Sequence, residues 1–266
     1  MGRQIKASLY RAACSPVSLL ILLVGVLFCA WAGKSADMKN VAELARELAG
    51  DTHALARLRN VFGVSGSTAA EIYEEYFRSA NLILVYGLAH SGAYTFNIFL
   101  CAVFLGRDLF RLRLQPELLS CGRGRTLGAR ILLIQVLSAL YHVLLFLYGA
   151  RTYLVLGDHA PALLWGTLAG CILVTAANAA FLICIYMLFR HAVFGAVAAA
   201  AAEIVVMRLS LTVPISPARF FFNSFRSGGD AAALSAQMGP YLLWAAGYLV
   251  LFTSLSFVLF RRKELR

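Results

Sequence analysis

Residues 106–130 read GRDLFRLRLQPELLSCGRGRTLGAR, a basic stretch between two long apolar runs. A basic loop of this length between two membrane spans is retained in the cytoplasm, because Lys and Arg resist translocation. This assignment orients the rest of the chain. Within the loop, apolar residues alternate with arginines up to Pro116, and a Gly-Arg-Gly-Arg turn leads to the next apolar run. The pattern predicts a short cytosolic element suited to docking against a partner.

The composition indicates a membrane protein with several spans. Of the 266 residues, 61% are apolar and 14% are charged, and the mean hydropathy is +0.75. Soluble domains carry about 45–50% apolar and about 25% charged residues. We attribute the net charge of +11 to cytoplasmic span ends near anionic headgroups, and we expect no nucleic-acid partner because no soluble basic domain is visible. The six cysteines form no C-x-x-C pair, so neither a disulfide framework nor a metal site is predicted.

The apolar runs predict an all-α fold of six transmembrane helices, with both termini inside and one domain over residues 1–266. The predicted spans are residues 16–33, 79–105, 131–150, 162–189, 192–207 and 240–260. When the long first external segment is set aside, the short inside loops and tails hold most of the Lys and Arg, as this topology requires.

The N-terminal residues 2–14 place Ile5, Leu9 and Ala12 on one face, which predicts an amphipathic helix lying in the membrane interface. An ordinary charged N-terminus is the alternative. The basic flank and the Ala30-Trp31-Ala32 sequence also leave open a cleaved signal peptide in place of a retained first span.

Two segments are predicted outside the membrane. Residues 34–78 are nearly neutral and carry capping patterns such as Thr68-x-x-Glu71, so we expect a helical external segment. Residues 208–239 contain prolines and glycines that break helices, yet also an apolar Phe220-Phe-Phe222 run. We expect this segment to dip into the outer membrane surface and return.

Polar side chains within the predicted spans are candidates for a transport pathway. Glu203 is the only acid well inside an apolar run, and an intramembrane carboxylate is a functional candidate by default. Pairing with Arg208 is the structural alternative. His90, Asn97 and Asn178 complete the candidate set, and for them ordinary helix–helix packing is the alternative.

Motifs for catalysis are absent from the sequence. No G-x-x-x-x-G-K-[ST] phosphate loop, H-E-x-x-H, G-x-S-x-G or paired-carboxylate pattern occurs. We therefore predict no catalytic, cofactor-binding or metal-binding residues, and expect that the chain by itself is not an enzyme.

The order of these features resembles a permease subunit of the type-2 ABC exporter family. The local likeness lies in Gly106-Arg-Asp108, Arg111-Leu-Arg113, Gly122-Arg-Gly-Arg125, Ala129-Arg-Ile-Leu132 and the tail 258–265, VLFRRKEL. Gly124 stands where the family commonly has serine, and Arg130 where it commonly has lysine.

The resemblance implies a multi-pass protein of the bacterial plasma membrane that forms a translocation pathway with a second copy or a sister permease. ATP would bind to a separate ABC ATPase subunit. Residues 106–128 would be the coupling segment in the cleft of that ATPase. Its expected contact residues are Arg107, Phe110, Arg111, Leu112, Arg113 and Leu114. The residues alone also allow an ATP-independent transporter that uses His90, His142 and Glu203, a structural or assembly membrane protein, or a loop that touches only lipid.

Overall fold

The computed structural model describes residues 2–34, 93–111, 122–156, 161–189, 191–210 and 231–262. These residues form helices and no strand, which confirms the all-α prediction for the part of the chain described. The elements are α1 (Gly2–Ala13), α2 (Pro16–Lys34), α7 (Ala93–Cys101), η2 (Ala102–Arg111), α9 (Arg123–Leu156), α10 (Pro161–Phe189), α11 (Ala192–Ser210) and α13 (Ala231–Arg262).

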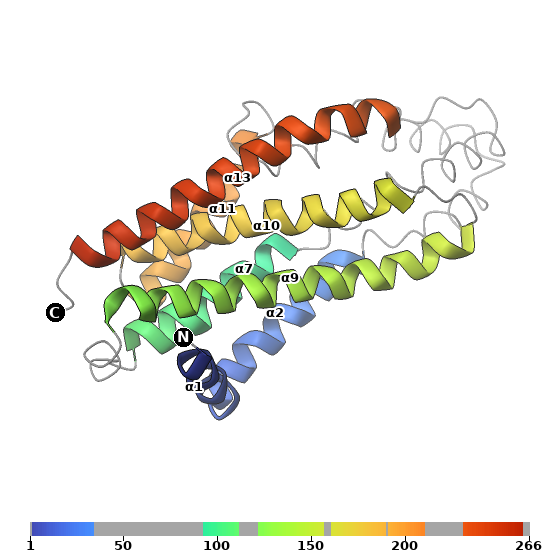
Figure 1. Ribbon diagram of the computed structural model, residues 1–266. Helices are drawn as coiled ribbons and strands as arrows, with labels where there is room; N and C mark the ends of the chain where they lie inside the picture. Colours follow the sequence, from blue (N-terminus) through green and yellow to red (C-terminus); the bar gives the residue numbers. More distant parts are fainter. Residues whose placement is uncertain are drawn as a thin grey trace.

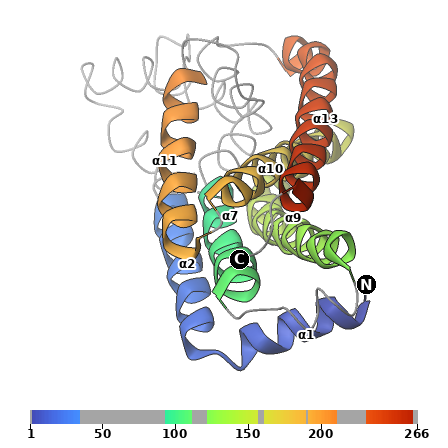
Figure 2. The ribbon, with the colours of Figure 1, turned by 90° about the vertical axis from the view of Figure 1, so that its left-hand side faces the viewer.

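Helix α10 lies at the centre of the described bundle (Figures 1 and 2). It contacts α7, α9, α11 and α13, and its inner side chains are almost fully buried. The core includes Leu182 and Tyr186 from α10, Phe104 from η2 and Ile134 from α9. A helix whose residues are mostly apolar around its whole circumference fits this central position, because it can bury every face against a neighbour.

The length and composition of several helices allow them to cross a membrane. Three qualify individually, over residues Arg123–Leu144, Leu168–Phe189 and Leu242–Arg261, and the bent pair formed by α1 and α2 qualifies together. Shorter apolar helices cover Thr95–Arg107 and Ala192–Val205. Large apolar side chains on the outer surface, such as Leu243 and Phe194, suit contact with lipid.

The N-terminal helix meets the first span at a sharp corner. The axes of α1 and α2 differ by 86°, and α1 crosses one end of the bundle beneath α7 and α9 (Figure 2). This confirms the predicted helix. Of the predicted apolar face, Ala12 is buried and Ile5 packs against the core, but Leu9 is 41% exposed, and the polar Gln4 and Ser8 are buried beside Ala12.

A polar contact explains this rotation of α1. The Gln4 side-chain amide donates to the Thr126 hydroxyl over 3.2 Å, and the Thr126 hydroxyl donates to the Gly122 carbonyl. The polar face of α1 therefore docks on the start of α9, while Leu9 and Tyr10 remain on the outside.

The same end of the bundle holds the C-terminal part of α13. The Arg261 guanidinium lies 3.6 Å from the point that a Cβ on Gly124 would occupy. Both chain ends are marked at this end in Figure 1. Helix α1, the start of α9 and the end of α13 thus share one basic end, which carries Arg3, Lys6, Arg123, Arg125 and Arg261 as exposed cations.

The quoted basic stretch is more helical than predicted. The second apolar run continues past residue 105 as the π-helix η2 up to Arg111, and α9 begins at Arg123 instead of residue 131. Gly122, directly before α9, has a left-handed backbone conformation with a φ of 78°. The expected Gly-Arg-Gly-Arg turn is therefore a single-residue turn, because Gly122 alone supplies the positive φ that L-residues avoid.

Several other predicted boundaries also shift. Helix α11 continues to Ser210, and α13 begins at Ala231 and passes through Pro240, so both ends of the predicted 208–239 segment are helical. Residues 35–78 of the predicted external segment lie outside the described residues, as do 211–230. His90, Leu112, Arg113 and Leu114 also lie outside them, and for Phe110 and Arg111 only the backbone is described.

Candidate functional site

Three of the predicted pathway residues come together inside the bundle. The Asn97 side-chain amide on α7 donates to the Asn178 side-chain carbonyl on α10 over 3.0 Å. The Asn178 amide in turn donates to the Glu203 carboxylate on α11 over 2.9 Å. Residues far apart in the sequence therefore form one hydrogen-bonded row across three helices.

The row lies well inside each of the three helical segments. Asn97 lies ten residues before Arg107, Asn178 eleven before Phe189, and Glu203 eleven after Ala192. The polar side chains are therefore in the interior of apolar helices and not at their ends.

The hydrogen bonds give the row a direction. Asn97 uses its amide NH₂ twice, toward Asn178 and toward the backbone carbonyl of Thr175 at 3.2 Å. Rotating the Asn178 amide by 180° would set its oxygen against the Glu203 carboxylate, so the described orientation is the favourable one. The row runs from donor to acceptor and ends on Glu203.

A second polar branch joins the row at Thr175. The Thr175 hydroxyl lies 2.9 Å from His142 Nε2, and His142 Nδ1 lies 3.1 Å from the Ser138 carbonyl on α9. A carbonyl can only accept, so Nδ1 carries the proton, Nε2 accepts from Thr175, and the imidazole is neutral. Thr175 thereby connects α9 to the Asn97 branch. Gln135, also on α9, donates to the Ala176 carbonyl on α10 over 3.0 Å.

The burial of these groups is nearly complete. Asn97 is 0% exposed, His142 and Thr175 are each 1% exposed, and Glu203 is 6% exposed. Burying an ionised carboxylate without a partner is costly, and removing one partner of a buried charged pair costs about 3–5 kcal/mol. The contact described for Glu203 is the Asn178 amide, while the side chain of Arg208, its predicted partner, lies outside the described set.

The arrangement can hold a polar group by hydrogen bonds. Among residues 2–34, 93–111, 122–156, 161–189, 191–210 and 231–262, no three His, Cys, Asp or Glu side chains gather as metal ligands. The described part of the row contains an acid, amides, a hydroxyl and a neutral imidazole. Such groups suit a polar pathway or a proton-linked conformational change.

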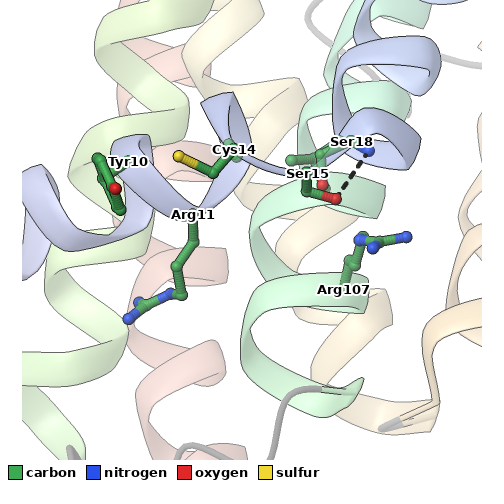
Figure 3. A pocket seen from close by; sticks show the side chains of 8 residues that line it. Tyr10, Arg11, Cys14, Ser15, Ser18 and Arg107 are labelled. Carbon is green, nitrogen blue, oxygen red and sulfur yellow. Dashed lines mark hydrogen bonds between the residues drawn. The ribbon is translucent and has the colours of Figure 1, made fainter.

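A second feature lies at the basic end of the bundle. Arg107, the one predicted coupling residue whose side chain is described, is half-buried and lines a cavity of about 310 Å³ between α1, α2 and η2 (Figure 3). Helix α1 contacts both η2 and α9, the two elements that flank residues 112–121. One interfacial helix therefore holds both ends of the predicted coupling segment.

Two contributors to these sites did not stand out in the sequence. Thr175 lies three residues before Asn178, so both occupy one face of α10, and this spacing was the available indication. The buried contact of Gln4 with Thr126 had no local indication, because it joins residues 122 positions apart.

Comparisons with protein-family models, with curated proteins and with solved structures gave no match, so the argument for function rests on the residues and their geometry.

Proposed function

We propose that this chain is a membrane-embedded permease subunit of an ATP-driven exporter, with the six-span, both-termini-inside topology expected of the type-2 ABC family. The observation that carries the proposal is the helical connection between the basic end and the buried polar row. Helix α7 continues directly into η2, so Asn97 and Arg107 belong to one uninterrupted helical segment. Helix α9 likewise joins Thr126, under α1, to His142.

This connection supplies a route for mechanical coupling. Residues 112–121 join η2 to α9, and a force on them would act on both helices. The same two helical segments carry Asn97 and His142, and both of these side chains hydrogen-bond to Thr175 on α10. A displacement of either helix would break hydrogen bonds in the row, which gives an external motor a physical means of switching between two packings.

The motor in this proposal is a separate ABC ATPase that binds ATP and docks on residues 106–128. The pathway would form between this chain and a second copy or a sister permease in the bacterial plasma membrane. The outer face of α13 exposes apolar side chains such as Leu243, Val250 and Leu251, which suit either lipid or a partner in the membrane.

The proposal is tested by copurification from the native host in mild detergent, followed by ATP-hydrolysis measurements. A Phe110→Asp/Leu112→Asp variant should lose the ATPase subunit and transport-stimulated hydrolysis while the bundle remains folded. A Gln115→Asp/Ser120→Asp variant adds the same two charges to the same segment and should retain the subunit. Equal copurification of an ATPase with both variants, or no ATPase with the unmodified chain, would reject the coupling role.

A second candidate is an ATP-independent transporter, which one observation favours. The Glu203 carboxylate and the His142 imidazole are two titratable groups buried in one hydrogen-bonded cluster, and each can take up and release a proton. In proteoliposomes without an ATPase, this candidate predicts substrate or proton flux that a Glu203→Gln variant abolishes. An absence of flux until an ATPase is added would favour the exporter.

A further inference from the structure

The cavity at the corner of α1, α2 and η2 has the chemistry of an anion site. It is lined by the cations Arg11 and Arg107, which come from different elements, and by the Tyr10, Ser15 and Ser18 side chains (Figure 3). Among the described side chains its lining contains no acid, and Ala12 and Val103 add apolar wall. The two guanidinium groups point to opposite sides of the cavity in Figure 3, and Arg11 also donates to the Ser8 hydroxyl over 3.3 Å. Arginine side chains and hydroxyls that line one cavity favour an anion such as phosphate, since arginine forms strong charge-assisted hydrogen bonds to phosphate.

The backbone adds to this preference. The Ser18 amide donates to the Ser15 hydroxyl over 3.3 Å, so Ser15 caps the start of the 19-residue helix α2 (Figure 3). The positive end of the α2 dipole therefore faces the cavity, where it favours an anion. The Tyr10 phenol, like any tyrosine with a pKa of about 10, is protonated and can donate at neutral pH.

The position of the cavity indicates a lipid as the source of the phosphate. It lies at the corner between the interfacial helix and the first span, which is the depth of lipid headgroups. Beside it, Val17, Leu20 and Leu27 on α2 are 45%, 59% and 60% exposed, so acyl chains can lie along that helix. A volume of about 310 Å³ holds a headgroup but not a whole lipid, since pockets for drug-sized ligands span about 300–1,000 Å³.

We propose that this cavity binds the phosphate of an anionic phospholipid and thereby fixes the angle between α1 and α2. The lipid joins three elements that otherwise meet through few contacts. Binding of the lipid makes the packing of α1 against η2 and α9 depend on the fraction of anionic lipid in the membrane. This holds whatever the chain transports.

The test uses Cys14, an exposed thiol that lines the cavity, as a local reporter. The full chain is placed in nanodiscs of phosphatidylcholine, with or without phosphatidylglycerol, and the rate of Cys14 alkylation by neutral N-ethylmaleimide is measured by peptide mass spectrometry. Phosphatidylglycerol should slow the reaction roughly tenfold, as expected when about nine sites in ten are occupied. Equal rates in the two bilayers would overturn the proposal.

Two matched variants separate the site from the general surface charge. Arg11→Gln/Arg107→Gln should lose the protection, whereas Arg3→Gln/Arg123→Gln removes the same two charges from the same end of the bundle and should keep it. If both variants lose the protection of Cys14 equally, the protection comes from the general surface charge and the proposed site is wrong. The comparison of bilayers with the unmodified chain needs no variant, so a misfolded variant leaves that test intact.

A soluble phosphate ester, added as a separate ligand, distinguishes a lipid phosphate from a free one. Glycerol 3-phosphate, added at millimolar concentration to phosphatidylcholine nanodiscs, should leave Cys14 alkylation unchanged if the acyl chains contribute to binding. Protection by glycerol 3-phosphate equal to that by phosphatidylglycerol would make the ligand a soluble phosphate ester and overturn the lipid assignment.

Discussion

The strongest quantitative prediction concerns Asn178, the middle member of the buried row. An Asn178→Ala substitution removes two interhelical hydrogen bonds, the 3.0 Å bond from Asn97 and the 2.9 Å bond to Glu203. Each ordinary interhelical hydrogen bond within a membrane is worth about 0.6 kcal/mol on average, so two such bonds would account for about 1.2 kcal/mol. The Glu203 bond differs because its acceptor is an acid that is only 6% exposed.

The charge on Glu203 raises the expected cost. Hydrogen bonds to charged groups contribute about 1.5–3 kcal/mol. Added to about 0.6 kcal/mol for the Asn97 bond, this leads us to expect that Asn178→Ala lowers the free energy of unfolding by about 3 kcal/mol at alkaline pH, where Glu203 is ionised.

A double-mutant cycle isolates the charge-dependent part. Glu203→Gln keeps a carbonyl that accepts from Asn178 but removes the charge, so Asn178→Ala in that background should cost only about 1 kcal/mol. The coupling free energy is then about 2 kcal/mol. As a matched control, Ser256→Ala removes a buried hydroxyl that donates within its own helix to Phe252, and should cost less than about 1 kcal/mol.

The assay is reversible unfolding of the purified chain in lipid–detergent micelles by titration with sodium dodecyl sulfate, followed by circular dichroism. The reasoning is refuted if Asn178→Ala costs the same, within about 0.5 kcal/mol, in the native and Glu203→Gln backgrounds, since independent sites add to within that margin. A cost no larger than that of the Ser256 control would also contradict the buried row.

Three further predictions test packing, backbone and topology. In Gly195→Ala, the new Cβ would lie 2.7 Å from the buried Tyr186 ring, so we expect a loss of about 1–3 kcal/mol in the same unfolding assay, whereas Gly247→Ala, with nothing within 4 Å, should be neutral or stabilising. Gly122→Ala forces an L-residue to a φ of 78° and should cost about 1–2 kcal/mol, and a stabilised variant would contradict the described start of α9. In intact cells, Ser120→Cys in a background where Cys14 and Cys121 are serine should react with a membrane-permeant maleimide and resist an impermeant one, and labelling from outside would invert the proposed topology.

Much of the helical framework was predictable from the sequence. The corner between α1 and α2 is local, because Ser15 caps the second helix and Pro16 suits its first turn. Helices α10 and α11 begin within one residue of the predicted starts of their spans, since long apolar runs bounded by polar or helix-breaking residues leave little freedom. The candidates Asn97, Asn178 and Glu203 were also visible, as polar residues within apolar runs.

The errors occurred where nonlocal contacts outweighed local preference. Pro240 was taken as the start of a span, but it lies within α13, which begins at Ala231. The arginines after residue 106 indicated a loop, yet η2 continues to Arg111 with Gly106 packed closely against the Ala192 backbone. Close packing of this kind holds a segment in helical form even where its charge pattern favours solvent.

By itself, the sequence determined an all-helical chain with membrane-length apolar helices, a basic stretch between two of them, and the types of polar residue that they bury. Only the tertiary structure decided that Asn97, Asn178 and Glu203 form one row, that His142 joins them through Thr175, and that α1 turns Gln4 toward Thr126. The physical reason is that an apolar helix can rotate about its axis at little cost in hydrophobic burial. Its final rotation is selected by interhelical hydrogen bonds and close packing, which depend on residues far apart in the chain.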